Sequence, residues 1–164
     1  MGIDIQQSRE QIFPFWNKPE LKTIFDISVM HDRRYKALSH MPIQGSKPAF
    51  LRNKYGEYND MVWTYFQKTP LISVDNVALI VSDLNQTTNV AKTISIWCRE
   101  KLISYVQFAL FTIENVTMYL DNYWNNSKRV REWTRLFSEW KVDHVAIPGF
   151  QGEVKETLGL VFYR

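Results

Sequence analysis

Apolar and polar residues fall into distinct blocks between residues 77 and 116. The run VALIV at residues 77–81 is continuously apolar and β-branched, which is typical of a strand covered on both faces of a parallel sheet. A helix is predicted over residues 89–101, where apolar side chains recur at helical spacing after candidate N-cap residues. The run YVQFALF at residues 105–111 predicts a second strand.

A strand, a crossover helix and a second strand form a right-handed βαβ unit, and ligands of such sheets bind beyond the carboxyl ends of the strands. Asp83 and Asn85 follow the first predicted strand, whereas Thr112, Glu114 and Asn115 follow the second. We therefore expect these two polar sets to face each other. Asp83 and Glu114 are the candidates for chemistry, although Glu114 fits equally well as a residue that fixes a turn.

The first 70 residues show aromatic clusters and no catalytic signature. An arm over residues 1–18 contains IFPFW, helices are predicted over about 19–30 and 58–67, and the Pro- and Gly-containing stretch 41–48 predicts a linker. Two modest helices and an arm offer too little mutual surface to fold alone. We expect this region to dock on a partner through Phe15, Trp16, Trp63 and Phe66, because buried aromatic residues anchor interfaces.

The last 40 residues predict another helix and two strands. SKRVREWTRLFSEW, from Ser127, has an apolar stripe at helical spacing, and its basic residues favour a solvated face over an anion-binding one. HVAIPG and LGLVFY then predict two short strands. The predicted domains are residues 1–70, a docking region, and residues 71–164, an α/β domain.

Composition restricts the class of protein. With 164 residues, 45% hydrophobic residues and a net charge of +3, the chain is expected to be globular, and it lacks the basic blocks of a nucleic-acid binder. The single cysteine, Cys98, excludes a disulfide framework. The sequence has no signal-peptide pattern and no apolar run long enough to span a membrane, so we expect a soluble protein or one held at a membrane by another component.

Other chemistries have little support. His31, His40 and His144 have no partner at metal-ligand spacing, so no metal site is predicted. Ser82 lacks the glycines of a nucleophile elbow, and neither glycine-rich nucleotide-binding motif is present.

The stretch from residue 77 to residue 116 resembles the cis-prenyltransferases, which include the undecaprenyl and dehydrodolichyl diphosphate synthases. ALIVSDLNQ is similar to the family's first strand and its D-G-N-x-R loop, and ISIWCREKLISYVQFALFTIENV is similar to its W-C to E-N stretch. The resemblance places Asp83 and Asn85 on the loop, and Thr112, Glu114 and Asn115 at the second strand end. It is closer still to the non-catalytic partner subunits of the Nogo-B receptor type.

Departures from the family pattern imply a lost active site. Leu84 replaces the loop glycine, Gln86 stands where an arginine is expected, and no carboxy-terminal basic cluster follows. Glycine amides and cationic side chains are what stabilise a diphosphate. The sequence is therefore interpreted as a non-enzymatic protein without a cofactor, and Mg²⁺ is expected only for an active relative.

The sequence-based hypothesis is an α/β fold, namely a truncated parallel-sheet cis-prenyltransferase-like fold with an N-terminal helical extension. Its expected function is that of a non-catalytic accessory subunit in a hetero-oligomeric protein complex at a membrane, with possible lipid contact and no nucleic acid. The expected location is intracellular, at a mitochondrial or endoplasmic-reticulum membrane. The alternatives are an active or regulatory subunit of a polyprenyl diphosphate synthase of the dolichol type, and a lipid-diphosphate binder without turnover.

Overall fold

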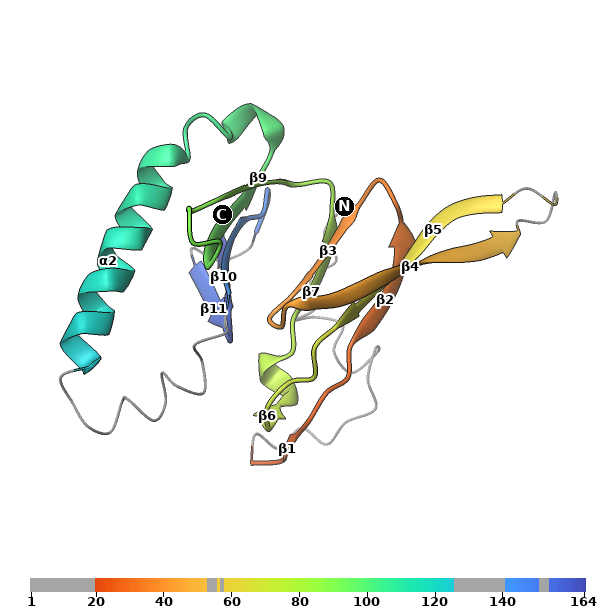
Figure 1. The fold of residues 1–164 in the computed structure, drawn as a ribbon, viewed down its shortest axis with the longest axis horizontal. Helices are drawn as coiled ribbons and strands as arrows, with labels where there is room; N and C mark the ends of the chain where they lie inside the picture. Colours follow the sequence, from red (N-terminus) through yellow and green to blue (C-terminus); the bar gives the residue numbers. More distant parts are fainter. Residues whose placement is uncertain (1–19, 53–55, 57, 126–140, 151–153) are drawn as a thin grey trace. The chain divides into compact units, whose positions relative to one another are not determined.

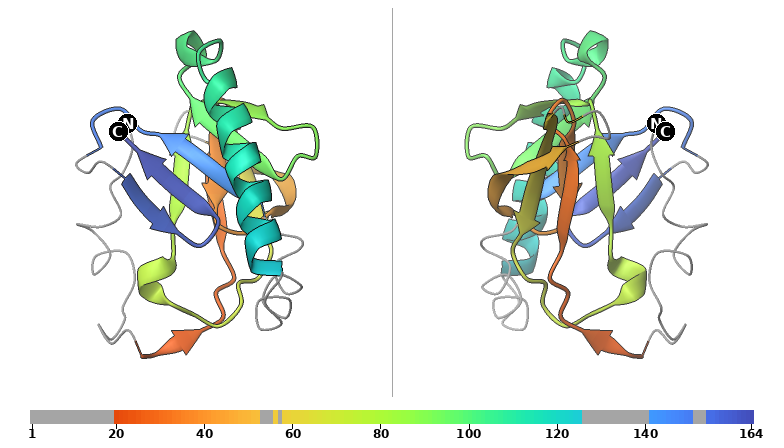
Figure 2. Two further views of the ribbon diagram at one scale, coloured as in Figure 1. Left: turned by 90° about the vertical axis from the view of Figure 1, so that its left-hand side faces the viewer. Right: turned by 90° about the vertical axis from the view of Figure 1, so that its right-hand side faces the viewer.

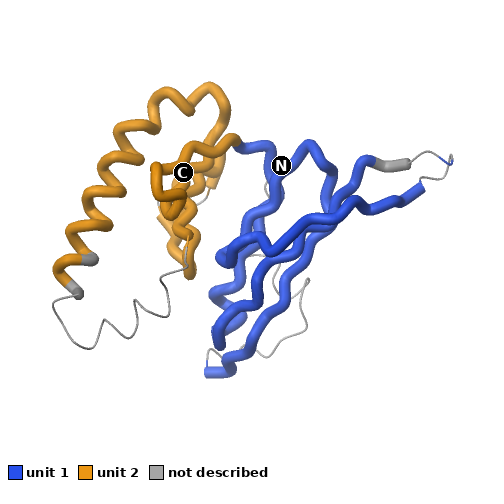
Figure 3. Tube along the Cα trace, viewed as in Figure 1, with its two compact units in different colours: residues 1–84 blue, residues 85–164 orange. Residues whose placement is uncertain are grey.

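The computed structural model describes residues 20–52, 56, 58–125, 141–150 and 154–164. Within this part, the chain forms twelve strands, one α-helix and two short 3₁₀ turns (Figure 1). Contacts divide the chain into two compact units, Met1–Leu84 and Asn85–Arg164 (Figure 3). The predicted boundary at residues 70 and 71 therefore falls inside unit 1. The predicted α/β prenyltransferase-like fold is wrong, because the structure is mostly β-sheet.

Unit 1 consists of antiparallel strand pairs in three small sheets. Its strands are β1 (Lys22–Thr23), β2 (Ser28–Asp32), β3 (Lys36–Ser39), β4 (Ile43–Arg52), β5 (Tyr58–Phe66), β6 (Ile72–Ser73) and β7 (Leu79–Ser82). The sheet orders are β1-β6, β2-β5-β4 and β3-β7. A 3₁₀ turn, Val74–Asn76, separates β6 from β7. Figure 1 shows β4 and β5 as one long twisted hairpin.

The core of unit 1 forms where strands of different sheets meet. Phe66, at the end of β5, is 1% exposed and clusters with buried Ala37 and Met41. Four partly buried residues complete this cluster: Ile27, Val29, Leu79 and Val81. Burying a phenylalanine and several aliphatic side chains together supplies the main favourable free energy for such a small unit.

The helices predicted in this region are wrong. Residues 19–30 include β1 and the start of β2, residues 58–67 contain β5, and the predicted linker 41–48 enters β4. In MVWTYF the buried residues Thr64 and Phe66 are two apart, so the inward face follows strand alternation and not helical spacing. β-Branched and aromatic residues also favour the strand.

Unit 2 is one mixed sheet with a helix. Its strands are β8 (Asn85–Thr88), β9 (Ile94–Cys98), β10 (Val142–Ala146), β11 (Val154–Thr157) and β12 (Leu160–Tyr163), and its helix is α2 (Gln107–Asn125). The sheet order is β11-β12-β10-β9-β8. The neighbours β9, β10 and β12 run parallel, whereas the edge strands β8 and β11 pair antiparallel.

Parallel pairing of β9 with β10 requires a crossover, and α2 lies within it. All five residues of β9 are buried, as expected for a parallel strand covered on both faces. Ile94 and Ile96 pack with Leu110 of α2, and Val106 and Ile113 join this cluster. The two views in Figure 2 show α2 lying across the sheet of unit 2.

The predicted βαβ unit was placed on the wrong residues. Residues 94–98, within the predicted helix 89–101, form strand β9, and residues 107–111 of the predicted second strand begin α2. Asn89 does not cap a helix: its side-chain oxygen accepts hydrogen bonds from the amides of Thr93 and Ile94. It thereby closes the β8–β9 hairpin, in which Lys92 has a positive φ of 58°. The run VALIV contains most of β7, which pairs antiparallel with β3 and not in a parallel sheet.

Two sequence-based strands are confirmed. HVAIPG overlaps β10 and LGLVFY contains β12. The two-residue connection between β11 and β12 includes Gly159, whose φ of 74° lies in the left-handed region that favours glycine. The predicted helix at residues 127–140 lies outside the described residues.

Candidate functional site

The second of the two strand ends on which the polar site was predicted is a helix in the structure. Asp83 is exposed between β7 and β8, in unit 1, whereas Asn85 opens β8 in unit 2. Thr112 and Asn115 lie on α2 and bind its own backbone, through the carbonyls of Phe108 and Phe111. The site required a strand ending near residue 111, and that segment is helical.

Glu114 has a structural role. Its Oε1 accepts a hydrogen bond from Asn89 Nδ2 at 3.1 Å, which joins the β8–β9 hairpin to α2. Asn89 is buried, and its amide also donates to Thr93 Oγ1 at 3.2 Å. Of the two readings that the sequence left open for Glu114, the contacts favour the one in which it fixes a turn.

The predicted interface residues have different surroundings. Phe66 belongs to the core of unit 1, whereas Trp63 is 36% exposed and stacks on Tyr65 with ring centroids 6.2 Å apart. Phe15 and Trp16 lie outside the described residues.

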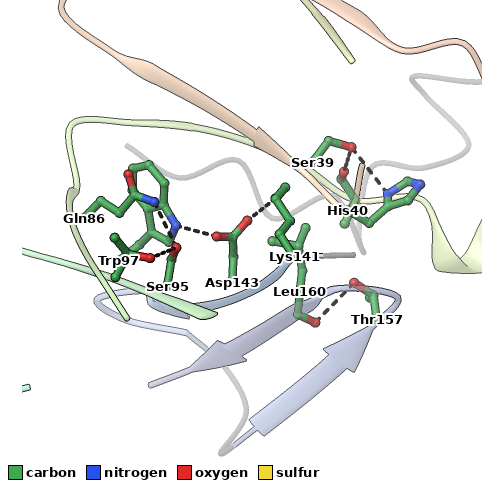
Figure 4. A network of polar contacts seen from close by, with 11 residues as sticks. Ser39, His40, Gln86, Ser95, Trp97, Lys141, Asp143, Thr157 and Leu160 are labelled. Atoms are coloured by element: carbon green, nitrogen blue, oxygen red, sulfur yellow. Dashed lines mark hydrogen bonds and ion pairs between the residues drawn. The ribbon is translucent and has the colours of Figure 1, made fainter. Parts of the chain in front are cut away.

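A buried carboxylate stands at the centre of unit 2. Asp143, in β10, is 2% exposed and accepts a hydrogen bond from the indole Nε1 of Trp97 at 2.9 Å. Its second oxygen pairs with the ammonium of Lys141. Figure 4 shows both side chains pointing at the carboxylate. Because buried charges must be paired and hydrogen-bonded, this arrangement is a stabilising centre of the sheet.

Small polar side chains continue the same sheet face toward the β8 edge. Gln86 Nε2 donates to Ser95 Oγ at 2.9 Å, and Ser95 Oγ donates to Thr88 Oγ1 at 3.3 Å. Ser95 is opposite Asp143 in the strand register. These bonds satisfy polar groups at a buried position, as expected in a folded interior.

The opposite face of β10, β12 and β11 carries a different polar group. His144 Nδ1 and Tyr163 Oη are 2.9 Å apart, and their rings stack with centroids 5.7 Å apart. Glu156, on β11, is opposite Val161, which in turn is opposite His144. His144, Glu156 and Tyr163 therefore share the face of the sheet that also carries Ile96, and we call them the His144 cluster.

Burial controls the protonation of the His144 cluster. It lowers the pKa of His144, against the opposing effect of the Asp143 charge, so the imidazole is neutral at pH 7. Burial also raises the pKa of the Tyr163 hydroxyl, and the charge of Glu156 adds to that rise. The cluster thus combines an exposed carboxylate with two neutral polar rings.

Sequence reasoning missed both polar groups of unit 2. It treated His144 as structural and did not single out Lys141, Asp143, Glu156 or Tyr163. A signal was available in KVDHV, where charged and titratable residues interrupt a β-branched strand. Their partners Trp97 and Tyr163 lie far away in sequence and were not identifiable from spacing.

Within the described residues, no group of three or more His, Cys, Asp or Glu side chains is placed to hold a metal ion. No helix in that part of the chain has the length and apolar character needed to cross a membrane.

Comparison with known proteins points to one enzyme family. The family model described as Peptidase M1 N-terminal domain matches residues 6–74. Mouse aminopeptidase Q (Mus musculus) is 32% identical over 158 residues, 93% of this chain and 26% of the relative. Bovine aminopeptidase N (Bos taurus) is 32% identical over 155 residues, 93% of this chain and 15% of the relative. The chain is thus similar to aminopeptidases over most of its length, and to the M1 N-terminal domain over residues 6–74.

Other relatives have the same kind of name. Bovine glutamyl aminopeptidase is 27% identical over 157 residues, again covering 93% of this chain but only 14% of the relative. The chain thus spans about a quarter or less of the length of these curated relatives.

The comparisons correct the cis-prenyltransferase resemblance and the function inferred from it. The aminopeptidase similarity covers nearly the whole chain, whereas the resemblance rested on residues 77–116, which form β7, β8, β9 and the first part of α2. A non-catalytic prenyltransferase-like subunit is therefore wrong, and so is the alternative of a polyprenyl diphosphate synthase. The prediction of a non-enzymatic protein is also wrong, because the relatives are aminopeptidases.

Proposed function

We propose that this chain is part of an M1-type aminopeptidase, which releases the amino-terminal residue of a peptide, and that Glu156 helps to bind the peptide's amino group. The observation that carries the second statement is the position of Glu156: an exposed carboxylate on an edge strand, beside the neutral His144 and Tyr163. Similarity to aminopeptidases over 93% of the chain supports the first statement.

The chemistry of the substrate selects a carboxylate. A free peptide amino group is largely protonated at pH 7, and an ammonium forms its strongest hydrogen bonds with a carboxylate. Four carboxylates of unit 2 have described side chains: Glu100, Glu114, Asp143 and Glu156. Glu114 binds Asn89, and Asp143 binds Trp97 and Lys141. Glu100 and Glu156 are exposed, and of these two only Glu156 lies on an edge strand.

The edge strand provides a second means of recognition. Among the described residues, β11 pairs only with β12. An extended peptide that adds a strand at such a sheet edge is a recurrent mode of peptide recognition. Exposed Val154, at 57%, lies on the same face as Glu156 and offers an apolar contact.

Neutral neighbours favour this role for Glu156. A protonated His144 would compete with the substrate ammonium for the carboxylate, but burial keeps the imidazole neutral at pH 7. The Tyr163 hydroxyl also remains protonated, because burial and the Glu156 charge both raise its pKa.

The test is a titration of the 164-residue chain with a tetrapeptide that has a free amino terminus and with its N-acetylated form. We expect the free peptide to bind about 5- to 10-fold more tightly, as one charge-assisted hydrogen bond implies. Glu156→Gln should abolish this difference, whereas the matched control Glu100→Gln should retain it. Equal binding of the two peptides by the unchanged chain would refute the role of Glu156.

A further inference from the structure

Helix α2 carries a second apolar surface that its own sheet does not use. Its inward residues Leu110 and Ile113 pack on Ile94 and Ile96 of β9. Six other apolar or aromatic residues are at least half exposed and form what we call the outer face of α2: Phe108 (78%), Phe111 (65%), Val116 (50%), Met118 (59%), Tyr119 (68%) and Tyr123 (66%). Tyr119 and Tyr123 stack on each other, with ring centroids 6.5 Å apart.

The outer face has the composition of an interface. A helix on a protein surface normally presents charged residues to water, and one that is apolar on all sides is buried. The 19 residues of α2 include only two charged ones, Glu114 and Asp121, and Glu114 is engaged with Asn89. Aromatic residues and methionine without charges are the signature of an interface core.

The lengths of the relatives indicate what covers this face. The matched span is 26% of mouse aminopeptidase Q and 15% of bovine aminopeptidase N, so most of each relative lies outside it. An aminopeptidase of that length has ample polypeptide to pack against α2. A membrane surface is a poorer fit, because basic residues are absent from α2.

We propose that the outer face of α2 is an internal interface, which packs against an apolar surface of the aminopeptidase polypeptide outside the matched span. This inference rests on the proposed function, since it takes the occupant from an aminopeptidase. It assigns α2 two apolar contacts: β9 on one side, and a further part of the enzyme on the other.

The experiment compares the 164-residue chain with a chimera in which it replaces the segment that it matches in bovine aminopeptidase N. Each protein carries either Phe108→Lys with Tyr119→Lys, or the control Leu71→Lys, whose side chain is 65% exposed in unit 1. In the chain alone, both changes should shift the thermal midpoint by less than about 2 °C, because the substituted residues are exposed. In the chimera, the α2 variant should lose about 5 °C or more, since a lysine is forced into an apolar interface, and the control should not.

Equal, small shifts in the chain and the chimera would overturn the proposal. So would a dimer of the 164-residue chain that Phe108→Lys with Tyr119→Lys converts to a monomer in sedimentation, because a second copy would then cover the face. If the unsubstituted chimera does not fold, the two lysines are placed at the aligned positions of bovine aminopeptidase N itself, where an unchanged midpoint refutes the interface.

Activity separates this proposal from the proposed function. A folded chimera that releases no amino acid from an aminoacyl p-nitroanilide contradicts the aminopeptidase assignment, while its thermal midpoints still report on α2. An active chimera that tolerates both lysines without a shift contradicts the interface alone.

Discussion

Units 1 and 2 differ in how their strands are paired and in how they bury polar groups. Unit 1 joins antiparallel strands into sheets of two and three strands, whereas unit 2 builds one five-stranded sheet around the parallel strands β9, β10 and β12. Antiparallel neighbours need only a short hairpin, but parallel neighbours need a crossover such as the one that contains α2.

Buried polar groups follow the same division. In unit 1 they include imidazole and hydroxyl groups: His31 Nε2 and Thr64 Oγ1 are 2.8 Å apart, and Ser39 Oγ donates to the Ala78 carbonyl at 2.9 Å. In unit 2 the buried group is the Asp143 carboxylate with Lys141 and Trp97. Neutral hydrogen bonds contribute modestly, whereas a buried charge is costly as soon as its partners are removed. Unit 2 should therefore be the more sensitive to single polar substitutions.

The largest effect is expected for Asp143→Ala in unit 2. The change removes the carboxylate that Lys141 and Trp97 both bind, and breaking a buried pair costs about 3–5 kcal/mol of unfolding free energy. Urea unfolding measures this loss. Asp143→Asn should lose less, because its carbonyl still accepts from Trp97. A loss below about 1 kcal/mol for Asp143→Ala would contradict the expectation that unit 2 is the more sensitive to single polar substitutions.

Phe66→Ala tests unit 1, where packing is the main support. The ring is 1% exposed in the core cluster, and truncating such a residue costs about 3–5 kcal/mol. Hydrogen exchange should accelerate first in β2, β4 and β5. The control Leu71→Ala, at a 65% exposed side chain, should stay within about 0.5 kcal/mol of the unchanged protein. Unchanged exchange in those strands would show that Phe66 does not anchor unit 1.

Thr64→Val tests the buried hydrogen bond between Thr64 and His31 in unit 1. Valine has the shape of threonine but lacks the hydroxyl that pairs with His31 Nε2, so a loss of about 1–3 kcal/mol is expected. Thr64→Ser keeps the hydroxyl and should recover part of the loss. If Thr64→Val proved as damaging as Asp143→Ala, the ranking of charged above neutral polar groups would fail.

The smallest effect is a pH dependence from His144. Its pKa is lowered by burial, so on acidification the unfolded chain takes up the proton first. Stability from this group is complete above its ordinary pKa, near 6.5, and is lost progressively as the pH falls from there toward the folded-state pKa. His144→Phe keeps a ring beside Tyr163 and should flatten the stability curve below about pH 6.5. An identical curve for the variant would refute this assignment.

Sequence patterns alone were sufficient for short apolar strands bounded by turn residues. HVAIPG and LGLVFY were identified as strands, and they correspond to β10 and β12. Trp97, an apolar residue of the segment predicted as helix 89–101, is 7% exposed on strand β9. Burial depends on the apolar character of a side chain, which a sequence shows directly.

Whether an apolar run becomes helix or strand was decided by tertiary structure. ISIWC and QFALF are both short and apolar, and periodicity cannot distinguish a buried strand from a buried helix segment. β9 is a strand because β8 and β10 pair with its two edges and α2 packs on it, and β10 is distant in sequence. For the same reason Glu114 does not follow the end of a strand, because the segment from Gln107 onward forms α2.

The polar groups of unit 2 also required the tertiary structure. Trp97 meets Asp143 across 46 positions of chain, and Tyr163 meets His144 across 19. The sequence by itself shows that charged and aromatic residues lie within runs of β-branched residues. Such positions are unusual for charged side chains, which are rarely buried. Only the register of β9, β10, β12 and β11 determines which of them share a face, because a shift of one residue would turn each side chain to the opposite side of the sheet.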